Sequence, residues 1–377
     1  MPYQEVKKPA FYLPILDYMN GTGGLWNPSD SIDTNYYYSF RNADLRSMHL
    51  LNPEKINMIH DWGGDNNSGV NWDIFLRSGE HDSTQLSWSE IKSNNENYIY
   101  VFILGHNFNQ YNDGSQIKFN LQMTENDRED ASVVWEDADE IVEVYNYDAS
   151  NKLSSLHGVS VFKAKFDSLT AIKGFRYQFI CNVPPSQTNA TLLKIGSISL
   201  CTKYTPPHNP DLSLTMSKQF DGISKTTTRG GKTLSNKQFD GVPMWATAPS
   251  WVSTEYDLFN PNNGYEHVGD YKKRRTMGRR NWVMNFSYLS NAQLMPEYET
   301  IYESIHYAND DIMRSDSFIS KFINRTQASH IPFIFQPDSS NDAIDTFSIC
   351  RLNQEEVAFI QTAPSMYSCE LNIQETW

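Results

Sequence analysis

Long apolar runs are absent from this sequence of 377 residues. No stretch of about 18 apolar residues occurs, so no membrane-spanning helix is expected. The first residues, MPYQEVKKPAFYLP, contain no long apolar core, so we expect no signal peptide. These absences favour a soluble chain that is made in a reducing cytoplasm.

Cysteine is also scarce. The four cysteines are Cys181, Cys201, Cys350 and Cys369. None of them forms a CxxC pair or a spacing typical of a zinc site. Each lies in an apolar, strand-like context. We therefore expect buried free thiols rather than disulfides.

Motifs for catalysis and metal binding are missing as well. The nine histidines include no H-x-x-x-H or H-x-H pair, and no G-x-S-x-G motif occurs. His106 ends a strand in the tripeptide GHN, so we interpret it as a hydrogen-bonded histidine rather than a catalytic base. The adjacent acids Glu136 and Asp137 could serve a glycosidase only beside another carboxylate, which leaves a polysaccharide-cleaving enzyme as a third hypothesis. We predict a protein that is no enzyme and holds no cofactor or metal.

Charged residues make up only 20% of the chain, and the net charge is −14. An acidic surface repels duplex phosphates, which argues against broad nucleic-acid binding. Aromatic residues reach 13%, enough for large cores. The remaining polarity is mostly Asn, Ser, Thr and Gln, which favours β-structure with polar turns.

The sequence divides into three predicted parts. Residues 1–44 are expected to form an extended arm, and Tyr204–Ser213, which is rich in proline, is expected to be a linker. Residues 45–203 contain short apolar runs separated by turn residues, as in a jelly-roll β-sandwich. The clearest of these predicted strands are 97–108, 116–123, 159–166, 175–183 and 192–204. An acidic segment, 124–140, is interpreted as a solvated loop because it lacks the residue order of a calcium loop.

The third part, residues 204–377, contains the most regular pattern. Trp282, Met284, Phe286 and Tyr288 alternate with polar residues, which predicts a half-buried strand. Ser290 and Gln293 form a potential capping box, and apolar residues recur at helical spacing up to residue 312, so a flanking helix is expected. Three closing strands are predicted at 330–338, 345–352 and 366–376.

A short repeat lies earlier in this part. The sequence KQFDG occurs at 218–222 and again at 237–241. A hairpin turning at Gly230–Gly231 would place the two copies near each other on paired strands. The sequence RGGKT, at residues 229–233, resembles the end of a phosphate-binding loop. We interpret it as a turn because the rest of that motif is missing.

Six basic residues form the sharpest charge feature: Lys272, Lys273, Arg274, Arg275, Arg279 and Arg280. On an acidic chain, a concentrated basic patch fits contact with acidic surface on a neighbouring subunit. A merely solvated patch is the second interpretation, and contact with nucleic acid is the third. We predict a subunit interface at these residues.

The last hundred residues resemble the distal tail proteins of bacteriophages. In that family a strand with a G-R-x-W motif precedes a helix, a strand rich in proline and phenylalanine follows, and the chain ends on a strand. The matching residues are Gly278, Arg279, Trp282, Phe286, Pro332, Phe333, Phe335, Pro337, Arg351, Glu375 and Trp377. Residues 45–203 are similar to the galactose-binding or discoidin-type jelly rolls that phages insert in such proteins, on the LGHN turn and the IGSISL strand.

The resemblance implies a mainly β chain: a jelly-roll sandwich followed by a tail-tube-like β-sandwich with one flanking helix. It implies a virion structural protein, assembled in the host cytoplasm, that forms a ring, commonly hexameric, between the tail tube and the baseplate or tip. Other tail proteins would be its partners, and DNA would only pass through the channel. The strand edges of such a domain need partners, which ring assembly supplies.

A carbohydrate-binding protein that recognises the host receptor is the alternative function. Trp62, Trp72 and Trp88 would then stack on sugar rings of a host surface glycan. Tryptophans in β-sandwiches lie more often in the core than on a binding surface.

Overall fold

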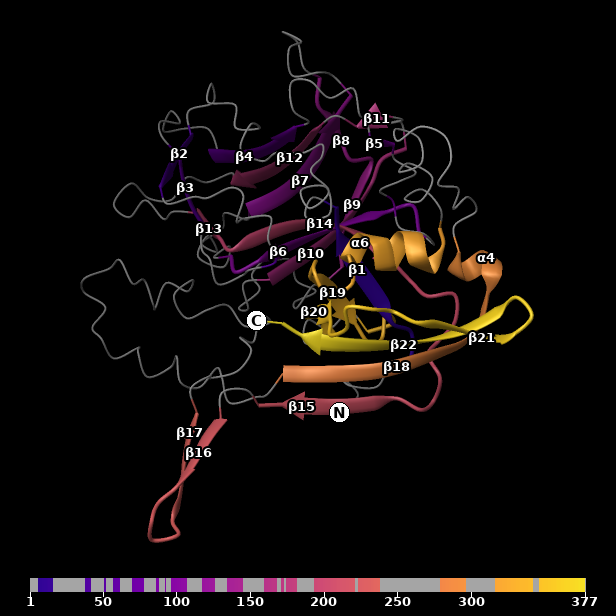
Figure 1. Ribbon diagram of the computed structural model, residues 1–377. Helices are drawn as coiled ribbons and strands as arrows, with labels where there is room; N and C mark the ends of the chain where they lie inside the picture. Colours follow the sequence, from indigo (N-terminus) through magenta and orange to yellow (C-terminus); the bar gives the residue numbers. More distant parts are fainter. Residues whose placement is uncertain are drawn as a thin grey trace, which may run out of the picture.

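The computed structural model of the chain describes residues 6–15, 38–41, 51, 57–61, 70–77, 86–87, 92, 96–106, 117–125, 134–144, 159–167, 171–172, 174–181, 193–220, 223–237, 279–295, 316–341 and 346–376. Within them the protein is mainly β, as predicted (Figure 1).

One antiparallel sheet of 11 strands dominates the fold. Its strands, in spatial order, are β15 (Thr215–Gln219), β18 (Arg279–Ser290), β22 (Met366–Glu375), β20 (Ser348–Leu352), β19 (Phe333–Gln336), β1 (Ala10–Pro14), β14 (Ser197–Tyr204), β6 (Ile99–Leu104), β10 (Val159–Lys165) and β9 (Glu140–Glu143), with β21 (Phe359–Ala363) beside β22. Strands from both larger predicted parts belong to this sheet, and the predicted division of the chain stays a prediction.

Four smaller sheets surround it. A four-stranded sheet contains β4 (Val70–Arg77), β12 (Gly174–Cys181), β7 (Ile117–Thr124) and β8 (Glu136–Asp137), and a three-stranded sheet contains β13 (Leu193–Ile195), β3 (Asn57–Asp61) and β2 (Tyr38–Arg41). Two pairs remain, β5 (Leu86–Ser87) with β11 (Ala171–Ile172), and β16 (Ile223–Thr227) with β17 (Thr233–Lys237). The ring of Phe119 on β7 stacks at 4.7 Å on Phe162 of β10, so the four-stranded sheet contacts the large one.

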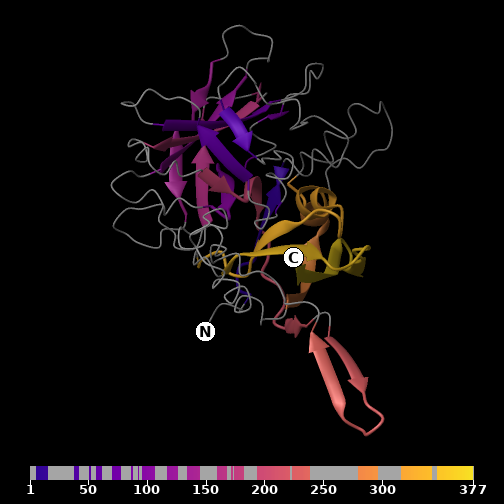
Figure 2. The same cartoon turned by 90° about the vertical axis from the view of Figure 1, so that its left-hand side faces the viewer.

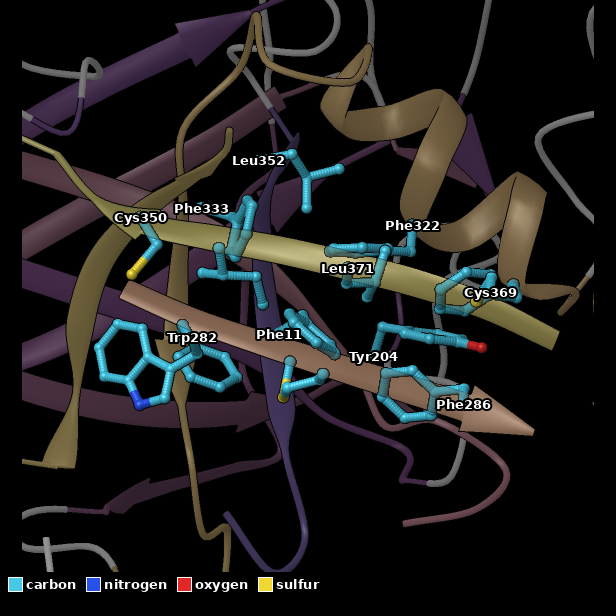
Figure 3. Close-up of a cluster of buried hydrophobic side chains, with 14 of the residues drawn as sticks. Phe11, Tyr204, Trp282, Phe286, Phe322, Phe333, Cys350, Leu352, Cys369 and Leu371 are labelled. Carbon is cyan, nitrogen blue, oxygen red and sulfur yellow. The ribbon is translucent and has the colours of Figure 1, made fainter. Parts of the chain in front are cut away.

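Strand β1 lies in the middle of the large sheet and is buried on both faces. Phe11 and Leu13 belong to one apolar cluster, whereas Ala10 and Tyr12 belong to another. Figure 3 shows the first cluster, where Phe11 lies among Phe333, Phe322 and the side chains of β18 and β22. The predicted N-terminal arm therefore contributes a central strand whose side chains alternate between two cores.

The first of two helical segments was only partly predicted. The Ser290–Gln293 capping box is confirmed, but the helix that it starts, α4 (Asn291–Leu294), ends within one turn. Met295 is extended because it precedes a proline, which disfavours the helical conformation. The rest of the predicted helix, 296–312, lies outside the described residues.

The second helical segment was missed altogether. It consists of η4 (Ile319–Ile323), a π-helical turn, and α6 (Asn324–Thr326). Phe318 and Phe322, four residues apart, point one face of this segment into the first cluster. That spacing was the signal in the sequence, but the segment is too short to stand out.

Strand β18 confirms most of the predicted alternation. Trp282, Met284 and Phe286 are buried, but a bulge between Phe286 and Leu289 shifts the register against β22. Tyr288, predicted to face the core, adopts a φ of 62° and is 74% exposed, while Leu289 takes the buried place. The extra residue of the bulge reverses the pattern that periodicity alone predicts.

Strand β22 changes its neighbour along one edge. Residues 366–369 pair with β21 and residues 373–375 pair with β20, while β18 occupies the opposite edge. The side chain of Gln354 fills the gap. Its amide nitrogen donates to the carbonyl of Glu370 at 3.2 Å, and its oxygen accepts from the N–H of Asn372 at 2.8 Å. One amide side chain thus replaces the missing stretch of neighbouring strand.

Several smaller predictions are also settled. Cys201, Cys350 and Cys369 are free and buried, and burial raises the pKa of the Cys369 thiol to about 12. The three closing strands are present as β19, β20 and β22. In the described part of the chain, every helix is too short or too polar to cross a bilayer.

Phe322 offers a test of this packing. Its ring lies 4.3 Å from Phe11 and 5.4 Å from Phe333, so it joins the missed helical segment to β1 and β19. Removing a fully buried ring leaves a cavity, and Phe322→Ala should lower the free energy of unfolding by about 3–5 kcal/mol. Urea denaturation followed by circular dichroism measures this loss. Ile360→Ala, at an exposed position, should change little. Similar losses in both variants would show that Phe322 does not lie in the core.

Candidate assembly surface

The large sheet ends at β15, whose five residues are mostly exposed. Among the described residues β15 pairs only with β18, from Thr215 opposite Val283 to Gln219 opposite Arg279. Figure 1 shows β15 at the margin of the sheet, below β18 and β22. Its outer edge therefore offers a row of backbone N–H and C=O groups for pairing with another strand.

The two faces of this margin differ. On the buried face Met216, Trp282 and Ile373 lie opposite one another across β15, β18 and β22. On the other face, the side-chain oxygen of Gln219 accepts from Asn281 at 3.2 Å and from Gln374 at 2.9 Å. These cross-strand hydrogen bonds hold the margin flat and polar, with apolar packing only beneath it.

Arg279 and Arg280 of the predicted basic interface lie at the start of β18, on opposite faces. Arg280 forms a salt bridge with Glu375, from Nη2 to Oε1 at 2.8 Å and from Nε to Oε2 at 3.2 Å. Its Nη2 also donates to Ser348, and its guanidinium lies 5.3 Å from the ring of Trp282. Arg280 thus has a role within the chain, whereas Arg279 is half-buried on the polar face.

The other four residues of that cluster, Lys272, Lys273, Arg274 and Arg275, lie outside the described residues. The interface role of the six stays a prediction. Reversing the charge of Arg280 would break its salt bridge with Glu375. Of the two described arginines, only Arg279 can therefore be substituted to test assembly without disturbing this salt bridge.

The hairpin predicted at Gly230–Gly231 is confirmed. Strand β16 pairs with β17 from Ile223 opposite Lys237 to Thr227 opposite Thr233. Gly231 has a φ of 80° in the turn, a conformation that glycine adopts without strain. The first copy of the repeat does not join this hairpin, because its Lys218 and Gln219 pair with β18. Residues 238–241 of the second copy lie outside the described residues.

The acidic segment differs from the predicted solvated loop. Its second half forms β8, which pairs with β7, and leads into β9, which pairs with β10. Asp137 accepts hydrogen bonds from Asn120 at 2.6 Å and from Gln122 at 2.5 Å. The segment therefore connects the four-stranded sheet to the large sheet, and the side chains of Glu136 and Asp137 are exposed.

Candidate catalytic and metal-binding groups do not gather into a site in the described part of the chain. His106 is fully buried, and its Nε2 lies 2.9 Å from the hydroxyl of Ser160, as the hydrogen-bonded interpretation predicted. Among the described residues there is no group of three His, Cys, Asp or Glu side chains that could hold a metal ion.

Of the three predicted sugar-stacking residues, only Trp72 lies in the described part of the chain. Trp62 and Trp88 lie outside the described residues, and Trp72 belongs to β4, opposite Phe179 of β12. Sugar binding stays a prediction. Comparisons of the chain with protein-family models, curated proteins and solved structures give no match.

The Arg280–Glu375 pair is testable by a double-mutant cycle. Glu375 is only 6% exposed, so Arg280→Met would leave a nearly buried carboxylate without its cation. We expect a loss of about 3–5 kcal/mol in the free energy of unfolding. Adding Glu375→Gln should recover most of this loss, because the amide oxygen of Gln can still accept a hydrogen bond from the backbone N–H of residue 280. Urea denaturation of Arg280→Met, of Glu375→Gln and of the double variant measures the coupling between the two side chains. Additive losses would contradict this coupling.

Glu143 on β9 predicts a pH dependence. Burial raises the pKa of this carboxyl from 4.5 to about 7. The folded chain therefore holds this proton more tightly than the unfolded chain. The resulting stabilisation of the folded state is complete below pH 4.5 and is lost as the pH rises through about 7. Glu143→Gln should remove this part of the slope and stabilise the protein at pH 8. Denaturation midpoints across this range test the difference, with Glu356→Gln at an exposed position as the control. Equal slopes in wild type and Glu143→Gln would refute it.

Proposed function

We propose that this chain is a structural protein of a bacteriophage tail, a distal tail protein that assembles with copies of itself into a ring. The ring joins the tail tube to the baseplate or tip, most simply as a hexamer. Other tail proteins bind its two faces, and DNA passes through its channel without being read. The chain acts as part of the virion and is assembled in the host cytoplasm.

The open margin of the large sheet carries the proposal. In the part of the chain that the structure describes, the 11-stranded sheet ends on an exposed strand, and natural proteins cover, shorten or pair such an edge. Heterologous contacts between identical copies satisfy such an edge and produce a ring when the rotation closes. Closure would also give the basic cluster an acidic partner surface, and its two described members, Arg279 and Arg280, lie on β18, the strand that pairs with β15.

The order of elements in the last hundred residues supports the family assignment. Arg279 and Trp282 lie on β18, a capped helical turn follows it, and Phe333 and Phe335 lie on β19, which Pro332 and Pro337 flank. The chain then closes on β20 and β22, which pair with β19 and β18. Of the residues that carry the resemblance, Arg279, Trp282, Phe286, Phe333, Phe335, Arg351 and Glu375 thus lie on strands of one sheet.

The part formed by residues 45–203 is proposed to be the inserted jelly roll. In favour of a sandwich, Phe119 on β7 contacts Phe162 on the large sheet and lies 5.5 Å from Phe179 on β12. Aromatic side chains between two sheets are the usual filling of such a core. Within the ring, this module would face outward, away from the channel.

The oligomeric state tests the proposal. Sedimentation velocity over a wide concentration range should show one closed oligomer in equilibrium with monomer, and negative-stain microscopy should show rings with a central hole. A chain that stays monomeric at every concentration, and is missing from phage particles, would refute the proposal.

Two proline variants of β15 test the edge itself. Successive amides in a strand point to opposite edges, so Ser217→Pro and Lys218→Pro differ in which edge loses a donor. The variant that loses the donor to β18 should melt earlier. The other should keep the wild-type melting temperature and lose assembly. If that second variant assembles like the wild type, β15 is not the assembly edge.

A further inference from the structure

The β16–β17 hairpin extends away from the rest of the described structure (Figures 1 and 2). Its two strands form a separate sheet and, among the described residues, pair only with each other. Every β16 side chain is exposed, as are Lys232, Thr233 and Leu234 at the start of β17. A two-stranded hairpin alone is at best marginally stable in water. Among the described residues no other strand covers this ladder, so a partner surface would stabilise it.

Apolar side chains on the hairpin are directed to solvent. Ile223 is 47% exposed and Leu234 is 51% exposed, and Phe220 just before the hairpin is 49% exposed. Ile223 and Leu234 lie on opposite faces of the ladder, because Thr226 is the residue opposite Leu234. Apolar groups on both faces favour a protein surface as the partner, since phosphates offer them no contact.

The hairpin is also basic. Residues 223–237 contain Lys225, Arg229, Lys232 and Lys237 and no acidic residue, so the rest of a chain of net charge −14 carries −18. The strongest opposite charge lies in residues 124–140, which contain eight acidic residues and one arginine. Glu125, Glu136 and Asp139 of that segment are exposed, and Val134 beside them is 60% exposed. The acidic segment thus offers both the charge and the apolar contact that the hairpin lacks.

The two features lie at opposite ends of the molecule. In both views the hairpin extends away from the body, and Figure 1 places it beyond β15, whereas β9 is the strand at the other end of the large sheet and β8 belongs to the four-stranded sheet. A hairpin therefore cannot reach the acidic segment of its own chain. The contact between them joins two copies head to tail, which is the heterologous arrangement that rings require.

We propose that the β16–β17 hairpin of each copy docks on the acidic β8–β9 segment of the next copy, an inference that rests on the self-assembly proposed above. Lys225 faces the carboxylates from the same face of the hairpin as Ile223, Lys232 reaches them from the turn, and Ile223 covers Val134. Complementary charge of this kind steers association and selects the partner surface, and salt weakens it.

A charge exchange within one chain tests the contact. Lys225→Glu with Lys232→Glu should raise the concentration of half-assembly about tenfold at low salt, because two attractive pairs become repulsive. Glu125→Lys with Glu136→Lys should do the same. The chain carrying all four changes keeps the net charge of −14 and should regain wild-type assembly, since each hairpin again meets opposite charge. Sedimentation velocity measures each value.

A matched control separates the specific contact from net charge. Lys225→Glu and Lys232→Glu combined with Glu355→Lys and Glu356→Lys also keep −14, but the two glutamates lie in an exposed loop elsewhere. This chain should stay defective. Recovery in the control as well would show a net-charge effect and overturn the docking.

Three further outcomes are decisive. If the hairpin reversal leaves assembly unchanged, the docking is wrong while the ring proposal stands. If that reversal leaves assembly unchanged but abolishes binding to a short DNA duplex, the hairpin contacts nucleic acid instead. If the wild-type chain never assembles, both this inference and the proposed function fail.

Discussion

The sharing of β1 between two apolar cores is the constraint on which the rest of the structure depends. Phe11 packs with the side chains of β18, β19 and the helical segment 318–326, whereas Tyr12 packs with Tyr100 and Phe102 of β6. The hydroxyl of Tyr12 donates to Gln336 at 2.7 Å, so even its polar group is satisfied inside the sheet. This strand holds the C-terminal strands and the strands of residues 97–204 in one continuous sheet. The margin at β15 lies at one end of that sheet, and the acidic β9 lies at the other.

The sequence predicts the elements whose pattern is local. Alternation at Trp282, Met284 and Phe286 is sufficient for β18, and the glycine pair at 230–231 is sufficient for the hairpin. The sequence does not predict which strands become neighbours. Nothing near Ala10–Pro14 indicates that it pairs with residues 201–204 on one side and 334–336 on the other. Long-range pairing depends on packing between distant segments, and a single sequence carries no local sign of it.

Local exceptions explain the remaining differences. The Tyr288 bulge adds one residue, which periodicity cannot show in advance, and the helical turn α4 ends at Leu294 because Met295 precedes a proline. At the candidate surface, the basic cluster is visible in the sequence as one run, but the structure separates Arg279 from Arg280 by placing them on opposite faces. The internal salt bridge of Arg280 follows from Glu375, which lies 95 residues further along the chain.

The central position of β1 also determines when folding can finish. Tyr12 and Gln336 are separated by 324 residues, so the first strand to leave the ribosome waits for one of the last before its second edge is paired. Contacts of such high sequence separation close slowly, because a long loop must be ordered before any contact rewards it. The sheet is thus complete only after β19 and the strands that follow it have been synthesised. Premature association of unfinished copies is limited in the same way, since the outer strands gain a rigid base only after the carboxy-terminal strands have joined the first.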